Sequence, residues 1–283
     1  MSVEATAAAP AENVRWRTAI PIALYALLAL TFSGLLVAVQ PHTGIDAATL
    51  SLVQFGPALA VPTTLLIIGT RRRQALRASL PAPVAGRWVL AGLLCTLVAA
   101  AIIGATVAIA LLLDDQPLFG PHPLGGAPFV VFALLQVLGA LGEETGWRGF
   151  MQPILESRFK RLVAVLITGT TWALWHVQAY TQGPVVALSF FTAAVLFAAL
   201  LGYLANGTVR QRILIATTGH WAINVALALA VGDDTATRPQ VTYITIGAAA
   251  AILLVLIPWT ATARPVPPTP TGVVPPLRDT ARD

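Results

Sequence analysis

The sequence contains few charged residues for its length. Only 10% of its 283 residues are Asp, Glu, Lys or Arg, whereas water-soluble proteins carry about a quarter. Apolar residues make up 57%, and the mean hydropathy is +0.77. This balance excludes an ordinary soluble domain. It favours one helical bundle in a lipid bilayer, because a backbone that crosses a membrane must satisfy its own hydrogen bonds.

Cysteine is almost absent, and so is lysine. The single cysteine, Cys95, lies in an apolar run, so an intrachain disulfide and a cysteine-based metal site are both excluded. One lysine stands among 17 basic residues; this preference for arginine, with the abundance of alanine, indicates a bacterium with a GC-rich genome. The N-terminus also lacks the basic start and short apolar core of a cleaved signal. We therefore expect the first apolar run to remain as a membrane anchor.

Long apolar runs dominate what is present. A spanning helix needs about 20 mostly apolar residues, and eight runs qualify. The sequence therefore predicts an all-α polytopic membrane bundle with about eight transmembrane helices. Residues 1–17 would form a cytoplasmic segment, 18–261 the membrane-embedded domain with a short interfacial helix at 151–161, and 262–283 a disordered Pro-rich cytoplasmic tail. The predicted spans are Thr18–Gln40, Leu50–Thr70, Trp88–Leu113, Pro128–Phe150, Leu162–Tyr180, Val185–Ala205, Ile213–Val231 and Thr242–Thr260.

The basic residues predict the orientation of the bundle. Arginine-rich loops alternate with acidic ones along the chain, and the positive-inside rule places the basic loops in the cytoplasm. The protein is then integral to the bacterial cytoplasmic membrane, with both termini in the cytoplasm. The net charge of +5 is explained by topology and lipid headgroups, so no nucleic-acid partner is expected. The basic loops are Arg71–Arg87, Arg148–Arg161 and Arg210–Arg212; the others carry Asp46, Asp114, Asp115, Asp233, Asp234 and Arg238.

Charged residues inside the fourth predicted span stand out, because each costs at least about 2.5–3.5 kcal/mol to insert. Glu144 and Arg148 are four residues apart, so they share a helix face and can neutralise each other. Glu143 points about 100° away from that pair, on the face of Gln136. Glu143 is therefore the candidate general base for activating a water molecule. The alternative is a helix end whose charges simply reach out to the aqueous interface.

Two further polar pairs lie in the fifth and seventh predicted spans. Trp172 and His176 are four residues apart, as are His220 and Asn224. A single histidine in a helix is more often a hydrogen-bonded packing residue, and Asn224 could equally provide a hydrogen bond between helices. Together, however, the three clusters supply a carboxylate, two imidazoles and a carboxamide from three helices.

These three motifs resemble the hallmarks of the CPBP family (CAAX proteases and bacteriocin-processing enzymes, also called Abi), which are intramembrane glutamic proteases. The family pattern is EExxxR, then an aromatic residue four positions before a histidine, then HxxxN or HxxxD. Here Trp172 replaces the more usual phenylalanine, and the resemblance covers residues 128–230. The matching positions are Glu143-Glu144…Arg148, Trp172…His176 and His220…Asn224.

The resemblance implies an endopeptidase that needs no cofactor. Glu143 with His176 would activate a water molecule for attack on a peptide carbonyl, and His220 with Asn224 would donate hydrogen bonds to the oxyanion. Arg148 would hold Glu144. The implied substrate is a membrane-associated peptide or protein in contact with the bilayer. Its identity is not encoded in these motifs.

Two alternatives remain open on the residues alone. The first is a zinc protease with Glu143, His176 and His220 as ligands, although the HExxH helix typical of such enzymes is missing. The second is a non-catalytic scaffold or immunity protein that uses the same residues to bind its helices together. One inconsistency concerns depth. At 1.5 Å per residue, Glu143 and His220 lie about 10–12 Å from the cytoplasmic boundary but His176 about 20 Å, which favours a later start for the fifth span.

Overall fold

The computed structural model describes residues 12–262 and contains no β-strand among them. Its helices confirm the predicted all-α polytopic bundle. Three of the η segments (η1, η2 and η4) are 3₁₀ helices, whereas η3 and η5 are π-helical turns. The elements are α1 (Glu12–Val39), η1 (Gln40–His42), η2 (Leu52–Phe55), α2 (Gly56–Ile67), α3 (Gly69–Ala78), α4 (Gly86–Leu113), α5 (Phe129–Gly146), η3 (Trp147–Met151), α6 (Gln152–Glu156), α7 (Arg161–Trp175), η4 (Val177–Thr181), α8 (Pro184–Leu204), α9 (Val209–Val231), α10 (Gln240–Ala251), η5 (Ile252–Leu256) and α11 (Ile257–Thr262).

Six helical segments in the described part of the chain are long and apolar enough to cross a membrane, which makes this an integral membrane protein. The predicted number of eight is not confirmed, because the second and fifth predicted spans form shorter helices, Leu52–Ile67 and Arg161–Trp175. A helix of 15 residues is only about 22 Å long, less than the thickness of the hydrocarbon core. The six segments are Ala19–His42, Gly86–Leu113, Phe129–Glu156, Pro184–Leu204, Val209–Val231 and Gln240–Thr262.

The ends of the chain differ from the predicted boundaries. Helix α1 begins at Glu12, six residues before the predicted start of the first span. Residues 1–11 and 263–283 lie outside the described residues, and with them most of the predicted N-terminal segment and nearly all of the predicted Pro-rich tail.

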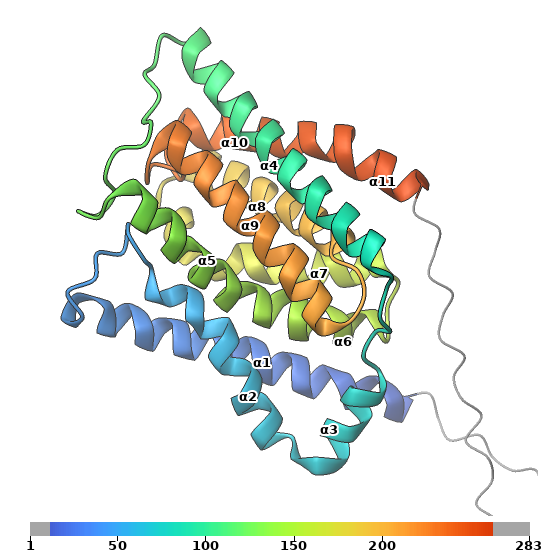
Figure 1. Cartoon of the computed structure of the whole chain (residues 1–283). Helices are drawn as coiled ribbons and strands as arrows, with labels where there is room; N and C mark the ends of the chain where they lie inside the picture. Colours follow the sequence, from blue (N-terminus) through green and yellow to red (C-terminus); the bar gives the residue numbers. More distant parts are fainter. Residues whose placement is uncertain (1–11, 263–283) are drawn as a thin grey trace, which may run out of the picture.

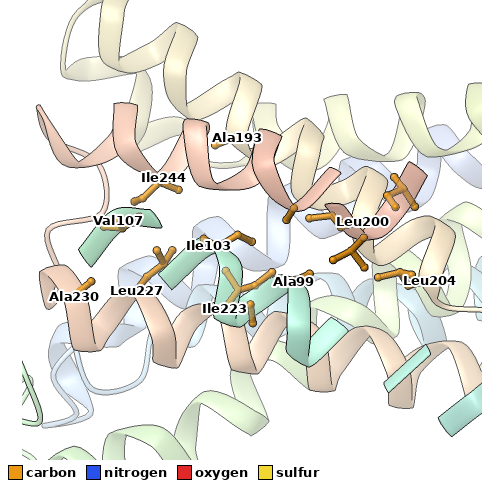
Figure 2. Close-up of a cluster of buried hydrophobic side chains, with 14 of the residues drawn as sticks. Ala99, Ile103, Val107, Ala193, Leu200, Leu204, Ile223, Leu227, Ala230 and Ile244 are labelled. Atoms are coloured by element: carbon orange, nitrogen blue, oxygen red, sulfur yellow. The ribbon is translucent and has the colours of Figure 1, made fainter. Parts of the chain in front are cut away.

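The largest buried cluster joins α4, α8, α9 and α10 (Figure 2). Alanine and branched aliphatic side chains from the four helices interdigitate there, including Ile103, Leu200, Ile223 and Ile244. A second cluster packs α1, α2 and the α5–α7 region around Tyr25. In Figure 1, α1 and α2 lie on one side of the bundle and α4 and α10 on the other, with α5 and α9 between them. The two glutamates of α5 and the histidine of α9 therefore lie between the two packed clusters.

The helix that carries the glutamates does not end where the sequence predicted. Helix α5 continues through the π-turn η3 into α6, so that one helical rod runs from Phe129 to Glu156. The predicted interfacial helix at 151–161 is wrong, because Gln152, Pro153 and Ile154 lie within this rod and are buried. Inserting one extra residue per turn, as a π-turn does, rotates the side chains beyond it, and such turns are frequent at functional sites.

Candidate functional site

Close packing of α5 against η2 and α2 creates the first half of the site. Three glycines of α5 face this contact. A Cβ atom on Gly139 would lie 2.2 Å from Gln54 Oε1, one on Gly142 2.7 Å from Gln54 O, and one on Gly146 2.2 Å from the Tyr25 hydroxyl. Only residues without a side chain allow the backbones to approach this closely, as in other membrane helix pairs.

Glu143 is the buried carboxylate that this packing surrounds. It is 2% exposed and accepts two hydrogen bonds from uncharged donors: Trp172 Nε1 at 2.6 Å and Gln54 Nε2 at 3.1 Å. Within residues 12–262 no cationic side chain forms an ion pair with it. A carboxylate has about four acceptor positions, so Glu143 keeps capacity for further donors such as water.

Glu144 has the opposite environment. Its Oε1 atom lies 2.9 Å from Arg148 Nη1 and 2.8 Å from His220 Nδ1, and the glutamate and the arginine are both 0% exposed. The Arg148 guanidinium also lies over the indole of Trp172, 4.7 Å from the ring centroid. The predicted pairing of Glu144 with Arg148 is therefore present in the structure. The π-turn, which begins at Trp147, places Arg148 beneath Trp172.

Both histidines are held through Nδ1. His176 Nδ1 lies 2.9 Å from the carbonyl oxygen of Trp172, and His220 Nδ1 lies 2.8 Å from Glu144 Oε1. A carbonyl oxygen and a carboxylate can only accept, so each Nδ1 carries the proton and donates it. Each Nε2 is then the nitrogen left for other partners. The ring of Trp172 lies between the two imidazoles, with centroid distances of 5.5 Å to His176 and 5.4 Å to His220.

The sequence placed His176 deeper in the membrane than Glu143, and in the structure the two residues lie at similar depth. The reason is not a later start of the fifth span. Helix α7 begins at Arg161, close to the predicted start, and ends at Trp175, so His176 follows its last residue. The error lay in the preceding span: because the α5 rod extends to Glu156, Glu143 is thirteen residues, or about 20 Å, from that end. His176 is about 22 Å along α7 from Arg161. The two residues are therefore at similar depth, and Trp172 bridges them.

Asn224 is hydrogen-bonded to Gln136 beside the site. Its Nδ2 atom donates to Gln136 Oε1 at 3.1 Å, and Asn224 lies one helical turn beyond His220 on α9. The amide carries two hydrogens, so one remains for another acceptor. These two residues line a cavity of about 290 Å³ together with Trp172, His176 and His220. Glu143 is not among the residues that line it, and no hydrogen bond joins Glu143 directly to His176 in the described chain.

Sequence reasoning missed Gln54 and the donor role of Trp172. Nothing in the second predicted span marked Gln54, because its contact with Glu143 joins residues 89 positions apart. Trp172 was noticed as part of a motif, but its indole N–H, and not only its ring, contacts the buried glutamate. The glycines at positions 139, 142 and 146 were the available signal, since regularly spaced glycines indicate a close helix contact.

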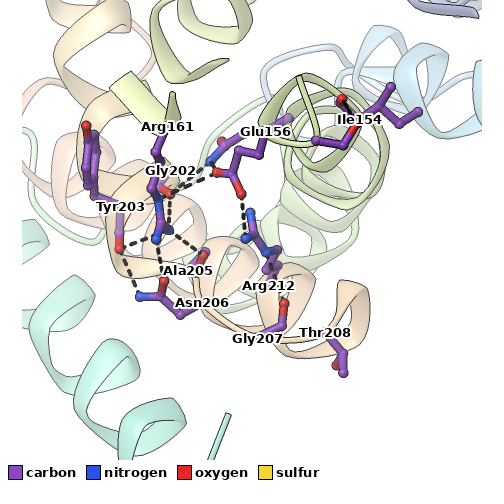
Figure 3. A network of polar contacts seen from close by, with 12 residues as sticks. Ile154, Glu156, Arg161, Gly202, Tyr203, Ala205, Asn206, Gly207, Thr208 and Arg212 are labelled. Carbon is purple, nitrogen blue, oxygen red and sulfur yellow. Dashed lines mark hydrogen bonds and ion pairs between the residues drawn. The ribbon is translucent and has the colours of Figure 1, made fainter. Parts of the chain in front are cut away.

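A network of ion pairs and hydrogen bonds lies at the arginine-rich end of the bundle (Figure 3). Glu156 Oε2 lies 2.6 Å from Arg212 Nη2, and Glu156 Oε1 lies 3.5 Å from Arg161 Nε. Arg161 Nη2 also donates to the carbonyl oxygens of Gly202, Tyr203 and Ala205, where α8 ends. One glutamate thus ties the ends of α6, α7 and α9 together, and these are the helical segments that position Arg148, Trp172 and His220.

A bound metal ion would need several donor side chains around one point. Among residues 12–262, no three His, Cys, Asp or Glu side chains converge in a way that could hold a metal ion. Each histidine donates its Nδ1 proton, to Trp172 O and to Glu144, so Nε2 is the nitrogen that each imidazole could offer to a metal ion.

Known proteins match the segment that carries these residues. The family model described as type II CAAX prenyl endopeptidase Rce1-like matches residues 125–226, a range that contains all three motifs. CAAX prenyl protease 2 of Methanococcus maripaludis is 29% identical over 119 residues, which are 38% of this chain and 44% of that protein. The matched region thus spans less than half of the relative's length. By these matches and by the motifs Glu143–Arg148, Trp172–His176 and His220–Asn224, residues 125–226 of this chain are similar to the CAAX protease (CPBP) family.

Proposed function

We propose that this protein is an intramembrane endopeptidase that hydrolyses a peptide bond of a membrane-associated peptide or protein without a metal cofactor. The observation that carries the proposal is the arrangement of the two histidines. Each is held at Nδ1 by an acceptor, both line one cavity, and a buried glutamate pair lies behind the indole between them.

In this proposal Glu143 and His176 act together on a water molecule. Neutral His176 has a lone pair at Nε2, because its proton is held at Nδ1. Both partners of Glu143 are donors, and its carboxylate oxygens can accept a further hydrogen bond from the water molecule. The water oxygen attacks the peptide carbonyl carbon while its proton passes to this pair. The tetrahedral intermediate then expels the amine, which takes up the proton as the C–N bond breaks.

His220 and Asn224 stabilise the oxyanion in the same proposal. A donor role for His220 requires hydrogen on both ring nitrogens, and Glu144 is a partner that stabilises the resulting positive charge. Asn224 offers the amide hydrogen that Gln136 does not use. Removing one oxyanion donor typically lowers turnover by about 10²–10³-fold.

The proposal is tested by substituting Glu143 with glutamine in the purified full chain. Glu143→Gln changes little volume and removes the base. Its single amide oxygen can still accept from Trp172, and Gln54 can turn its own amide so that its oxygen accepts from the new NH2 group. We expect cleavage of a reporter peptide in mixed micelles to be lost while the thermal unfolding temperature changes little. Comparative proteomics of membranes that contain either form would identify natural substrates. A folded Glu143→Gln variant with wild-type activity would refute the assignment.

The matched control is Gln178→Glu, a change of charge outside the site. Gln178 is exposed on η4, two residues after His176, so its substitution tests whether any change of charge near the site lowers activity. We expect this variant to retain turnover. Equal losses in both variants would show that the effect of Glu143→Gln is not specific to the base.

A further inference from the structure

The cavity beside the two histidines extends to one end of the bundle only. Its inner part is lined by Trp172, His176 and His220, and its walls come mainly from α8 and α9. At its far end it is lined by Ala47 and Ala48 of the α1–α2 connection and by Asp233 and Thr235 of the α9–α10 connection. Ala47 and Asp233 are exposed, so the cavity reaches the surface there.

This end of the bundle is poor in arginine. None of the residues that line the cavity comes from the loops at 71–87, 157–161 or 205–212, where the arginines gather. The positive-inside rule predicts that the cavity opens on the extracytoplasmic side. The described charged residues at that end are five aspartates and one arginine: Asp46, Asp114, Asp115, Asp233, Asp234 and Arg238.

Among the described residues that line the cavity, Asp233 is the one with a carboxylate side chain. Within the described residues its carboxylate forms no ion pair and no side-chain hydrogen bond. Its neighbour Asp234 does not line the cavity and instead accepts a hydrogen bond from Thr237 Oγ1. Arg238 is exposed and does not line the cavity either. The mouth of the cavity therefore carries a negative charge that is free to pair with a ligand.

We infer that the site is entered from the arginine-poor end, and that Asp233 is a specificity-determining residue that selects substrates with a cationic group beyond an apolar stretch. The identity of the ligand as a peptide substrate rests on the proposed peptidase function. The route of entry does not depend on that function. The wall residues Phe190, Phe197, Leu227 and Ile244 are apolar, so they suit apolar side chains. The occupant is thus a peptide with an apolar segment that ends in a lysine, an arginine or a free amine.

The fold also sets the spacing between the cleaved bond and the cationic group. His220 and Val231, the last residue of α9, are eleven residues apart along the helix, or about 17 Å. An extended peptide rises about 3.3 Å per residue. The cationic group therefore lies about five residues from the cleaved bond, on the side of the substrate that points to the cavity mouth.

A peptide series measures this spacing. Quenched-fluorescent peptides that are apolar except for one lysine, moved one position at a time, would be incubated with the purified full chain, and the cleaved bond located by mass spectrometry. We expect KM to be lowest when the lysine is about five residues from the cleaved bond. Asp233→Asn should remove this dependence of KM on the lysine position, whereas Asp234→Asn should keep it. Cleavage that does not depend on the lysine position would overturn the inference.

Thiol labelling tests entry and charge selection without any need for turnover. The reporter is Ala228→Cys, at a cavity-lining position, in a Cys95→Ala background that removes the single native thiol. Sealed vesicles of known orientation would be treated with a cationic (ethyltrimethylammonium) or an anionic (ethylsulfonate) methanethiosulfonate. Ala78→Cys, on the exposed face of α3, is the control for the opposite end. Ala193→Cys on α8 replaces the reporter if Ala228→Cys does not fold.

We expect the reporter to react from the extracytoplasmic side and Ala78→Cys from the cytoplasmic side only. The ratio of the cationic to the anionic rate should fall about sixfold with Asp233→Asn. Residue 233 is five residues from the reporter, or roughly 8 Å, and one charge at about that distance in water changes each rate about 2.4-fold, in opposite directions. The ratio should not change with Asp234→Asn. Labelling of the reporter from the cytoplasmic side alone, or a ratio that Asp233→Asn leaves unchanged, would overturn the inference. The same labelling in a Glu143→Gln background, together with no peptide cleavage by the wild type, would refute the proposed function and leave the inference standing.

Discussion

Replacing Arg148 by methionine removes the positive charge that faces Glu144. Both side chains are at most 1% exposed, and the two charged groups are 2.9 Å apart. Methionine keeps an apolar side chain of similar length, so loss of packing contributes little. The variant would leave Glu144 as a buried carboxylate with His220 as its remaining partner, 2.8 Å away.

The magnitude follows from these contacts. Removing one partner of a buried ion pair typically lowers the free energy of unfolding by about 3–5 kcal/mol, because the other charge stays buried without compensation. The lost contact between the buried guanidinium and the Trp172 ring forms part of this decrease, since a desolvated cation–π pair contributes about 2 kcal/mol. His220 still donates to Glu144 and offsets part of the loss. We therefore expect a decrease of about 3–4 kcal/mol for Arg148→Met.

Denaturation in mixed micelles, followed by tryptophan fluorescence, would measure this decrease. Arg158→Met is the matched control, because Arg158 is exposed and its loss should change stability by no more than about 0.5 kcal/mol. The double variant Arg148→Met with Glu144→Gln removes both charges and should recover most of the stability. An Arg148→Met protein within about 1 kcal/mol of wild type, or a double variant as unstable as the single one, would refute the reasoning.

Three further predictions concern packing, turnover and metal. Gly146→Ala should prevent stable folding in a thermal unfolding assay, because its Cβ would lie 2.2 Å from the Tyr25 hydroxyl and 2.8 Å from a backbone oxygen. Gly34→Ala is the control and should be tolerated, because no atom lies within 4 Å of its Cβ. Asn224→Ala should lower kcat by about 10²–10³-fold without loss of folding; an unchanged kcat would remove Asn224 from the oxyanion site. Elemental analysis should find no stoichiometric zinc in the detergent-purified protein, and turnover should survive chelation; one tightly held zinc whose removal abolishes activity would establish the metal mechanism instead.

Much of the site could be predicted because its residues repeat at helical spacing. Glu144 and Arg148 are four apart on one helix, and the structure pairs them as the spacing required. His220 and Asn224 are also four apart, and both line the cavity. Trp172 and His176 differ: their contact depends on the end of α7 at Trp175, where the histidine turns back to the Trp172 carbonyl oxygen. Spacing on a regular helix could not predict that turn.

Helix ends and long-range contacts account for what the sequence could not predict. The π-turn that carries α5 on to Glu156 has no simple residue signal, because it depends on how the helix packs against its neighbours. The contact of Gln54 with Glu143 joins distant positions, and a buried glutamine in an apolar run looks the same whatever it faces. Two predicted spans also form shorter helices than predicted, since apolar composition alone does not determine where a helix stops.

The sequence by itself determined the lipid environment, the all-α class and the chemical groups of the site, because each depends on composition or on spacing along one helix. Only the tertiary structure decided which groups meet. It set Trp172 between Glu143 and the two histidines, tied each histidine through Nδ1, and directed the cavity toward Asp233. These features depend on the relative tilt and close approach of helices. That geometry is settled by side-chain packing across the bundle, where a glycine in place of any larger residue changes the distance between two helices.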